Sequence, residues 1–242
     1  MRISLVIPAY NEGGYLPRLL DSVAVAARSY SRGPDAVETI VADNASTDAT
    51  AVIARARGCV VVRVVERSIA AARNGGARAA RGEILAFVDA DMRIHPGTFD
   101  AIERALASPR VVGGATGATL ERWSLGLAVT YGLMVPMTWI TGMDTGVVFC
   151  RKADFHAAGG YDERRRIAED VAFLTALKRV GRRRGQRLAR PRGVKCIAST
   201  RKFDRHGDWH FWPLLPRLLW LWAFKPAALQ RHIDRYWYEP ER

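Results

Sequence analysis

The sequence predicts an α/β protein with a mainly parallel sheet and helices on both of its faces. Over the first half of the chain, apolar segments of strand length alternate with segments of helical spacing, and the connections between them are short. The 242 residues are 49% hydrophobic and 25% charged, which is ordinary for a folded domain. This composition excludes disordered, collagen-like and disulfide-scaffold classes.

The chain opens with a predicted strand and helix. Residues 3–7 form a continuous apolar run that is too short for the core of a signal peptide, and residues 8–14 supply a turn. Over residues 16–28, leucines and a valine recur at helical spacing, which places them on one helix face.

The next two strand–helix pairs follow the same order. Residues 37–42 and 59–65 are mainly apolar, the second segment mainly β-branched, so both predict strands. The helices between and after them are expected at residues 49–57 and 69–80, and Gly58 closes the first of the two.

Three further elements complete the predicted sheet. Residues 83–88 read as a fourth strand, residues 98–107 as a helix, and residues 111–120 as a last strand-like stretch. In sheets of this kind, ligands bind at the carboxyl ends of the strands. Polar turns follow three of the predicted strands, at Tyr10–Glu12, Asp43–Asp48 and Asp89–Asp91.

Asp89 and Asp91 form a pair of carboxylates one residue apart at a strand end. Such a pair suits Mg²⁺ or Mn²⁺, which prefer oxygen ligands and often add substrate phosphates to their shell. The alternative is that both are solvated turn residues.

Asp43 ends a predicted strand, where its carboxylate can accept hydrogen bonds from a nucleobase N–H. The alternative is that Asp43, Ser46 and Asp48 cap the following helix, and Ser46 or Asp48 is the better placed of the three for capping. Arg73 lies in a helix beside two glycines, where it can face a phosphate or a base, or stay on the surface.

Glu169 and Asp170 begin a helix expected over residues 171–180. A carboxylate at this position is either a capping residue or a general base facing a reacting hydroxyl. The helix is expected to end at Gly181, which places the following arginine run in a solvated loop.

Positive charge is concentrated in the second part of the chain. The 37 Lys and Arg exceed the 24 Asp and Glu by 13, and residues 151–242 carry 22 basic and 10 acidic residues. A field of this sign attracts nucleic acid, a nucleotide diphosphate or an anionic membrane.

Two apolar stretches bear on membrane contact. Residues 123–143 carry no charge, but polar residues, glycines and a proline interrupt them, which favours a buried helix and loop over a spanning helix. Residues 209–224 are rich in Trp and Leu with basic residues around them. They fit an interfacial helix on anionic lipid, or a helix packed on the core or on a second subunit.

The three cysteines, Cys59, Cys150 and Cys196, are far apart and match no zinc spacing. They are expected to be reduced thiols in a cytoplasmic protein. If the Trp/Leu-rich stretch binds lipid, the protein is expected to be peripheral at the inner face of the cell membrane.

Seven motifs in order resemble the family 2 glycosyltransferases, which have a GT-A fold. The motifs are Val6–Glu12, Val41–Asp48, Ala72–Ala77, Phe87–Asp91, Gly142–Gly146, Gly159–Glu163 and Ala168–Asp170. The resemblance implies a GT-A domain over residues 1–205, with a nucleotide-binding half to residue 120 and an acceptor half from residue 121. A Trp/Leu-rich helical extension is expected over residues 206–242.

The resemblance also implies roles for single residues. A nucleotide-sugar donor, most simply a UDP-sugar, would be bound by Pro8, Tyr10, Glu12, Asp43, Arg73, Asp89 and Gly146. Asp91 would bind Mn²⁺ or Mg²⁺, and Asp170 matches the general base of an inverting, metal-dependent transfer. The acceptor would be a lipid, a glycan or a small molecule.

One family motif is missing. Members that polymerise sugars often carry Gln-x-x-Arg-Trp after the general base. The corresponding residues 199–207 of this chain read Ser-Thr-Arg-Lys-Phe-Asp-Arg-His-Gly and lack this motif, which favours non-processive transfer. Arg201 is expected at the diphosphate and His206 at the metal.

Three other classes of protein fit the sequence less well. A nucleotidyltransferase that forms sugar nucleotides would need a longer Gly-rich loop than Gly13–Gly14. The charge would suit a nucleic-acid-binding module, but no such motif is found and the expected cleft is acidic. A dinucleotide-dependent oxidoreductase lacks its Gly-x-Gly-x-x-Gly.

Overall fold

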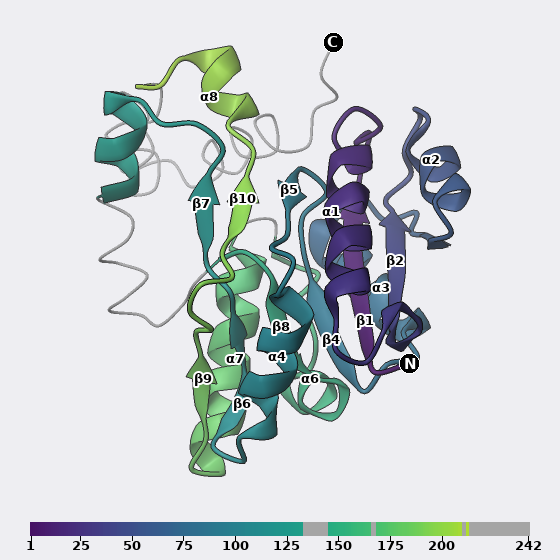
Figure 1. Ribbon diagram of the computed structural model, residues 1–242, viewed down its shortest axis with the longest axis vertical. Coiled ribbons are helices and arrows are strands. Elements are labelled where there is room, and N and C mark those ends of the chain that lie inside the picture. The colour runs from purple at the N-terminus through teal and green to yellow at the C-terminus, as the bar shows by residue number, and fades with distance from the viewer. Residues whose placement is uncertain (133–144, 166–167, 210–211, 213–242) are drawn as a thin grey trace. The chain divides into compact units, whose positions relative to one another are not determined.

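The computed structural model describes residues 1–132, 145–165, 168–209 and 212 (Figure 1). Contacts divide the chain into two compact units, one of residues 1–119 and 142–198 and the other of residues 120–141 and 199–242. The predictions for residues 133–143, for most of residues 209–224 and for most of the C-terminal extension lie outside the described residues.

The first unit contains the predicted succession of strands and helices, together with elements that were not predicted. Its main-sheet strands are β1 (Ile3–Ala9), β2 (Val37–Asp43), β3 (Val60–Arg63), β4 (Ile84–Phe87), β6 (Val111–Ala115), β8 (Val148–Arg151) and β9 (Arg187–Ala189). Its helices are α1 (Leu16–Ser29), η1 (Pro34–Ala36), α2 (Thr50–Ala56), α3 (Ile69–Ala79), α4 (Thr98–Ala107), α6 (Lys152–Ala158) and α7 (Glu169–Arg183). Four of these elements were not predicted: η1, β8, α6 and β9.

The main sheet has the order β3-β2-β1-β4-β8-β6-β9. β1 pairs in parallel with β2 and β4, β2 with β3, and β6 with β9, while β8 runs antiparallel between β4 and β6. The predicted mainly parallel sheet is therefore confirmed. The carboxyl ends of β1, β2, β4, β6 and β9 all point toward one edge, which we call the functional edge.

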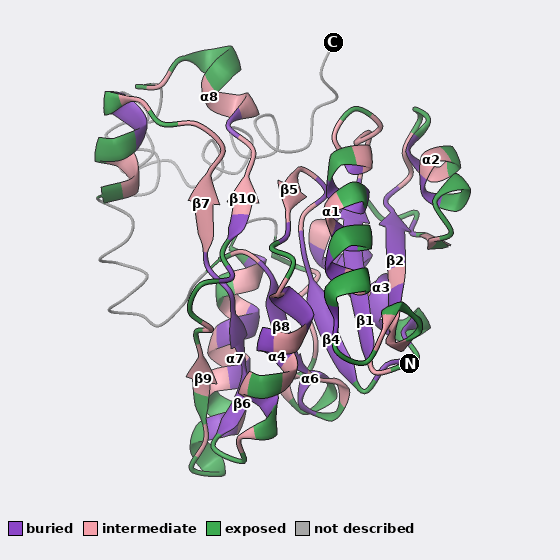
Figure 2. Ribbon diagram, in the orientation of Figure 1, coloured by how far each residue is buried: buried purple, intermediate pink, exposed green. Residues whose placement is uncertain are grey.

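Helices cover both faces of this sheet, as predicted. One core joins α1, α2 and α4 to the Ile3, Leu5 and Ile7 side of β1, and the other joins α3, α6 and α7 to the Val6 side. Side chains alternate along β1 between these cores, so the strand is buried along its whole length (Figure 2).

Two predicted elements differ in the structure. The stretch expected as one strand over residues 111–120 divides into β6 and β7 (Ala118–Leu120), with Gly117 at a positive φ of 80° between them. β7 joins β5 (Met92–Arg93) and β10 (Cys196–Ala198) in a small three-stranded sheet of order β5-β10-β7. The left-handed conformation at Gly117 breaks the strand and redirects the chain.

The predicted end of α7 at Gly181 is wrong, because the helix continues to Arg183. Gly181 is buried inside the helix, and a Cβ there would lie 2.8 Å from Cγ1 of Val112 on β6. Close packing of the helix on the sheet therefore explains this glycine, and Arg182 and Arg183 belong to the helix rather than to a loop.

The second unit is described in part. Residues 125–132 are helical, and α8 (Arg201–His206) follows the first unit. The Arg122 guanidinium binds Asp204 at 2.6 Å and both carboxylate oxygens of Asp208. Hydrogen bonds from Arg122 lower the pKa of Asp208 to about 2.

Within the described ranges, no helix combines the length and apolar character that crossing a bilayer requires. The three cysteines are free thiols, Cys150 and Cys196 buried and Cys59 partly buried, as predicted. Burial raises the pKa of the Cys59 thiol to about 11, which keeps it protonated at neutral pH.

Candidate functional site

The polar turns predicted from the sequence lie at the functional edge. β1 and β2 pair in register up to Ala9 opposite Asp43, so Tyr10–Glu12 and Asp43–Asp48 leave the sheet side by side. β4 lies on the other side of β1, with Phe87 opposite Val6, and Asp89 and Asp91 follow it. The sheet topology therefore gathers three of the predicted motifs in one place.

Hydrogen bonds join the first two turns to each other. The backbone N–H of Asn11 donates to Ser46 Oγ at 3.0 Å, and Asn11 Oδ1 accepts from the N–H of Thr47 at 2.8 Å. Asp48 Oδ2 accepts from the N–H of Gly13 at 2.9 Å, while Asp43 Oδ1 accepts from the N–H of Ser46 at 3.1 Å. The turns thus form one braced surface.

Asp48, not Asp43, contacts the start of the next helix. Its Oδ1 accepts from the backbone N–H and the hydroxyl of Thr50, the first residue of α2. Burial opposes these hydrogen bonds, yet they hold the pKa of Asp48 below its ordinary value. Asp43 is itself buried at the end of β2, where it orders its own turn.

Backbone strain is concentrated in the same motifs. Among the described residues, positive φ angles occur at three non-glycine positions, Asn11 at 52°, Ala45 at 61° and Ala168 at 53°. Each lies in a turn that the sequence assigned to the site, and for alanine this conformation is costly. Such strain persists where the surrounding structure enforces it, which is typical of ligand sites.

Arg73 connects two of these motifs through a buried ion-pair network. Its Nη2 donates to Asp89 Oδ1 at 2.7 Å and its Nη1 donates to Glu169 Oε1 at 2.7 Å. The guanidinium also lies over the ring of Tyr161, with Cζ 5.1 Å from the centroid. A residue on α3 therefore joins the turn after β4 to the first turn of α7.

Burial and neighbouring charges have opposite effects on the pKa values of the groups in this network. Burial acts to lower the pKa of Arg73, but the carboxylates around it, Asp89 first, raise that pKa above its ordinary value. Burial raises the pKa of Glu169, with Arg73 opposing the shift. The Nε of Arg73 is buried and has no hydrogen-bond partner among the described residues. An unsatisfied buried donor of this kind is costly, so the site holds its cation at the expense of stability.

Asp170 occupies the first turn of α7, directly after Glu169. Its Oδ1 accepts from the N–H of Val171 at 2.8 Å, and its side chain is partly exposed. Because Arg73 fixes Glu169 against the Asp89 turn, the network holds the neighbouring Asp170 at the functional edge.

The predicted metal ligand Asp91 is partly exposed in the turn after β4. The described residues contain no group of three or more His, Cys, Asp and Glu side chains that could hold an ion by themselves. A carboxylate in this turn fits Mg²⁺ or Mn²⁺ if phosphate oxygens and water complete the shell, as these ions commonly require.

Gly146 packs closely on the backbone of Gly117. Its φ is 94°, and a Cβ at this position would lie 2.4 Å from the carbonyl oxygen of Gly117. Gly117 in turn donates its N–H to the carbonyl of Thr145 at 2.9 Å. Only glycine fits this contact, which explains the residue structurally. Its predicted role toward the donor sugar stays a prediction.

The remaining predicted residues lie in two places. Pro8 is in β1, and Tyr10 and Glu12 are in the turn that follows it. Arg201 and His206 lie on α8 in the second unit, so their predicted roles toward diphosphate and metal stay predictions.

Three residues contribute to this site in roles that the sequence did not predict. Arg67 places its Cζ 4.0 Å from the Tyr10 ring centroid. Asn74 exchanges hydrogen bonds with the backbone of Tyr161, at 2.8 and 2.9 Å. Glu169 is the buried partner of Arg73. Asn74 and Glu169 lie within two of the seven motifs, whereas Arg67 lies in none. Their partners could not be predicted, because these lie far away along the chain.

The family model for glycosyl transferase family 2 matches residues 4–157, which is well over half of the chain. This range contains the motifs after β1, β2 and β4 and the arginine of α3.

Curated relatives match parts of the chain. A validoxylamine A glucosyltransferase of Streptomyces hygroscopicus subsp. limoneus is 33% identical over 113 residues, covering 44% of this chain and 24% of the relative. An undecaprenyl-phosphate 4-deoxy-4-formamido-L-arabinose transferase of Pseudomonas paraeruginosa is 36% identical over 124 residues, covering 46% and 34%. The matched part thus spans between a quarter and a third of each relative's length.

Solved structures share the fold. The mannosyltransferase PcManGT from Pyrobaculum calidifontis, solved with GDP-Man and Mn²⁺, has a TM-score of 0.65 at 22% identity, over 81% of this chain and 56% of that one. Staphylococcus aureus TarS in complex with UDP has a TM-score of 0.61 at 18% identity, over 86% and 63%. The sheet order, the seven motifs and the family match agree: the chain belongs to glycosyl transferase family 2 and has the GT-A fold.

Proposed function

We propose that the chain is a non-processive, metal-dependent glycosyltransferase that moves a sugar from a nucleotide-sugar to a hydroxyl or phosphate acceptor. The observation that supports this most is the network around Arg73. It ties the Asp89–Asp91 turn, suited to a diphosphate and its ion, to the helix start that carries Asp170. A leaving group and a general base must be close to each other for transfer, and this network brings their carriers together.

The donor we propose is a UDP-sugar. Tyr10 and Asp43 belong to the braced turns after β1 and β2, where an aromatic ring can stack on a base and a carboxylate can accept its N–H. Pro8, Glu12 and Asp89 complete this side of the proposed donor site. TarS was solved with UDP and PcManGT with GDP-Man, which supports a nucleoside diphosphate as part of the bound donor.

A divalent ion, Mn²⁺ or Mg²⁺, is proposed at Asp91. When bound, such an ion neutralises the charge of the departing diphosphate. The mannosyltransferase relative was solved with Mn²⁺, in keeping with this proposal. Arg73 is too fully engaged with Asp89 and Glu169 to take over that task, so its own task is to hold the two carboxylates in position.

Asp170 is proposed as the general base. Its carboxylate takes the proton from the acceptor hydroxyl while that oxygen forms a bond to the anomeric carbon. The bond from this carbon to the diphosphate oxygen breaks, and its electron pair leaves with the nucleoside diphosphate. Attack opposite to the leaving group inverts the anomeric configuration.

The acceptor class follows from neither the fold nor the relatives alone. One relative is named for validoxylamine A and the other for undecaprenyl phosphate, so the family's members differ in this respect.

We place the reaction on the cytoplasmic side of the cell membrane, in keeping with the reduced, largely buried thiols.

A donor screen tests the proposal. Thermal unfolding is measured with UDP-, GDP- and dTDP-sugars, each with and without Mn²⁺, for the wild type and for Asp170→Asn. We expect UDP-sugars with Mn²⁺ to raise the unfolding temperature of both proteins, because ligands that bind the folded state stabilise it. With an acceptor that the wild type glycosylates, Asp170→Asn should show no sugar transfer. Stabilisation by no nucleotide, or full transfer by Asp170→Asn, would contradict the proposal.

A further inference from the structure

A continuous basic segment lies outside the site described above. Residues 178–195 contain nine Lys and Arg and no Asp or Glu. They run from the last turns of α7 through β9 to the connection that enters β10. Eight of the nine are exposed: Arg179, Arg182, Arg183, Arg184, Arg187, Arg190, Arg192 and Lys195. We call this surface the basic strip.

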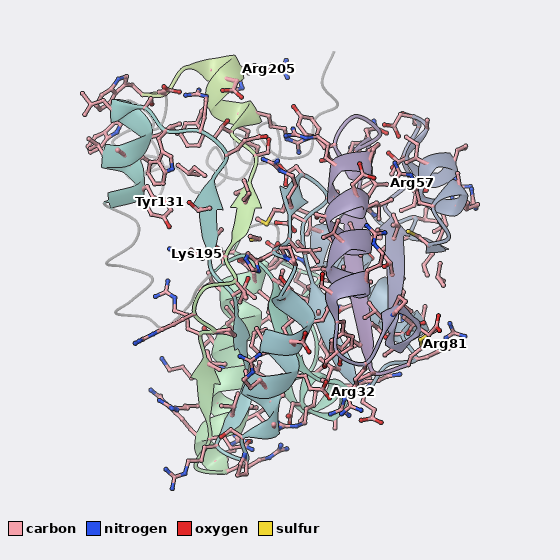
Figure 3. All side chains as sticks on the ribbon, in the orientation of Figure 1. Arg32, Arg57, Arg81, Tyr131, Lys195 and Arg205 are labelled. Atoms are coloured by element: carbon pink, nitrogen blue, oxygen red, sulfur yellow. The ribbon has the colours of Figure 1, made fainter. Side chains whose placement is uncertain are left out.

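The basic strip differs from the rest of the first unit in the continuity of its charge, because no acidic residue interrupts residues 178–195. Elsewhere, several arginines pair with carboxylates, as Arg32 does with Glu103 at 2.8 Å and Arg57 with Asp21 at 2.5 Å; both arginines are labelled in Figure 3. Other exposed arginines have no ion pair among the described residues, but they are single residues on separate helices: Arg28, Arg55 and Arg104. On the strip, Arg184 binds the buried Asp154 at 2.6 Å.

Several cations of the strip have no such compensation. Within the described part of the chain, no ion pair involves the following six residues: Arg179, Arg182, Arg183, Arg187, Arg192 and Lys195. Like charges at this density repel one another and weaken the folded state, so the surface is matched to an external anion.

The topology directs the strip toward the site. α7 begins at the functional edge with Asp170 and ends at the opposite edge, where its exposed end is visible in Figure 2. β9 then returns in parallel with β6, so the residues that follow it arrive at the functional edge again. Lys195, labelled in Figure 3, belongs to this final connection. The strip therefore follows one border of the sheet up to the edge that carries the site.

Protection of the sheet border explains only part of the strip. β9 is an edge strand, and charged residues on such strands prevent pairing with other chains. That requirement covers the three residues of β9. It does not cover Arg179 and Arg182 on α7, or Arg192 and Lys195 beyond β9.

We propose that the basic strip binds the anionic phospholipid headgroups of a bilayer and so holds the functional edge at the membrane surface. Each Lys or Arg close to an anionic surface contributes about 1 kcal/mol of binding, and a broad row of cations adds these contributions without a shaped pocket. The inference rests on the proposed function, under which the functional edge is the site of sugar transfer. It implies that the acceptor lies in the lipid bilayer.

The test compares two triple variants of the full chain with equal net charge. Arg182→Glu, Arg187→Glu and Arg192→Glu together alter the strip. Arg28→Glu, Arg55→Glu and Arg104→Glu together alter exposed arginines of α1, α2 and α4. Sedimentation with vesicles of phosphatidylcholine, or with 30% phosphatidylglycerol added, is measured at about 0.15 M salt without nucleotide, where exposed charges are screened beyond roughly 8 Å. UDP-induced stabilisation is measured in parallel.

We expect wild type to bind the anionic vesicles at least about tenfold more tightly than the neutral ones, and the strip variant to lose that preference while the control keeps it. Undiminished UDP stabilisation in the strip variant shows that it is folded and keeps its donor site. The proposal is overturned if the wild type shows no preference, if both triples lose it equally, or if single-stranded RNA at equal charge displaces the protein from the vesicles. Because vesicle binding is read without nucleotide, its failure is distinct from failure to bind a donor.

Discussion

Arg73 is the residue on which the geometry of the site depends most. Its side chain is 8% exposed and that of Glu169 is 11% exposed, so each would be a buried charge without the other. We predict that Arg73→Met lowers the free energy of unfolding by about 3 kcal/mol, because Glu169 is left unpaired. Adding Glu169→Gln should restore about 1 kcal/mol or more, since the unpaired charge is then gone. Urea denaturation of both variants measures the two values.

Glu163→Gln provides the matched control for this pair. Glu163 accepts a hydrogen bond from Asn74, the neighbour of Arg73 on α3, but forms no hydrogen bond or ion pair with Arg73 itself. If Glu163→Gln restores as much stability to Arg73→Met as Glu169→Gln does, the cost does not come from the unpaired Glu169 carboxylate.

At the residue scale, the sequence identified carboxylates better than their partners. Asp43, Asp89, Asp91 and Asp170 were predicted because each occupies a strand end or a helix start with a recognisable motif. The pairing of Arg73 with Asp89 and Glu169 was not predicted, because these partners lie 16 and 96 residues away in the sequence. Local spacing carries no information about which distant carboxylate a buried guanidinium meets.

At the scale of elements, α3 shows how a motif can serve packing. A Cβ at Gly76 would lie 2.4 Å from Cγ1 of Val6 on β1, so the glycine allows the helix to approach the sheet. We predict that Gly76→Ala lowers the free energy of unfolding by about 1–3 kcal/mol through overpacking, despite alanine's better helix propensity. Thermal and urea unfolding measure this loss.

Gly14→Ala is the control, because a Cβ there meets no atom within 4 Å. Its effect should stay within about 0.5 kcal/mol. Equal losses at both positions would show that backbone freedom, and not the contact with Val6, governs Gly76.

The predicted elements agreed closely with the observed ones where periodicity was strong. The helix over residues 98–107 was predicted with its observed bounds, and the helix over residues 16–28 missed one residue. The failures, at Gly117 and Gly181, have one physical origin. A glycine can break an element by adopting a positive φ, or it can sit inside a helix to let it pack closely, and the sequence alone does not distinguish these uses.

At the scale of the whole molecule, Glu103 joins the chain's first residues to α1 and α4. It accepts hydrogen bonds from Arg32 at 2.8 Å, from Tyr30 at 2.6 Å and from Arg2 at 2.9 Å. The hydrogen bond from Arg32 contributes most to lowering the pKa of Glu103 from 4.5 to about 2.

A depressed carboxyl pKa stabilises the folded state above the unfolded-state value. This contribution is lost as the pH falls from about 4.5 toward 2. We predict that Glu103→Gln reduces the loss of stability between pH 5 and pH 2.5 by about 1–2 kcal/mol, allowing for solvent screening. Urea denaturation at both pH values measures it. An unaltered pH dependence in Glu103→Gln would contradict this role.

The charge of the whole chain could be predicted in amount but not in arrangement. The excess of positive charge after residue 150 was evident from the sequence, where it fitted nucleotide, membrane and nucleic acid alike. The structure adds that six of these cations, along α7, β9 and the following connection, form no ion pair with the described residues and lie on the border that leads to the site. Only the pairing of strands could show that.

The most direct test of the account is calorimetric titration of UDP into the protein with and without Mn²⁺, repeated for Asp91→Ala and for the exposed control Asp35→Ala. We predict that Mn²⁺ tightens UDP binding by about tenfold or more in the wild type and the control, because the ion joins the diphosphate to the Asp91 carboxylate. Asp91→Ala should lose this gain. No binding of UDP in the presence of Mn²⁺, or an undiminished gain in Asp91→Ala, would contradict the assignment of this edge as a nucleotide-sugar site.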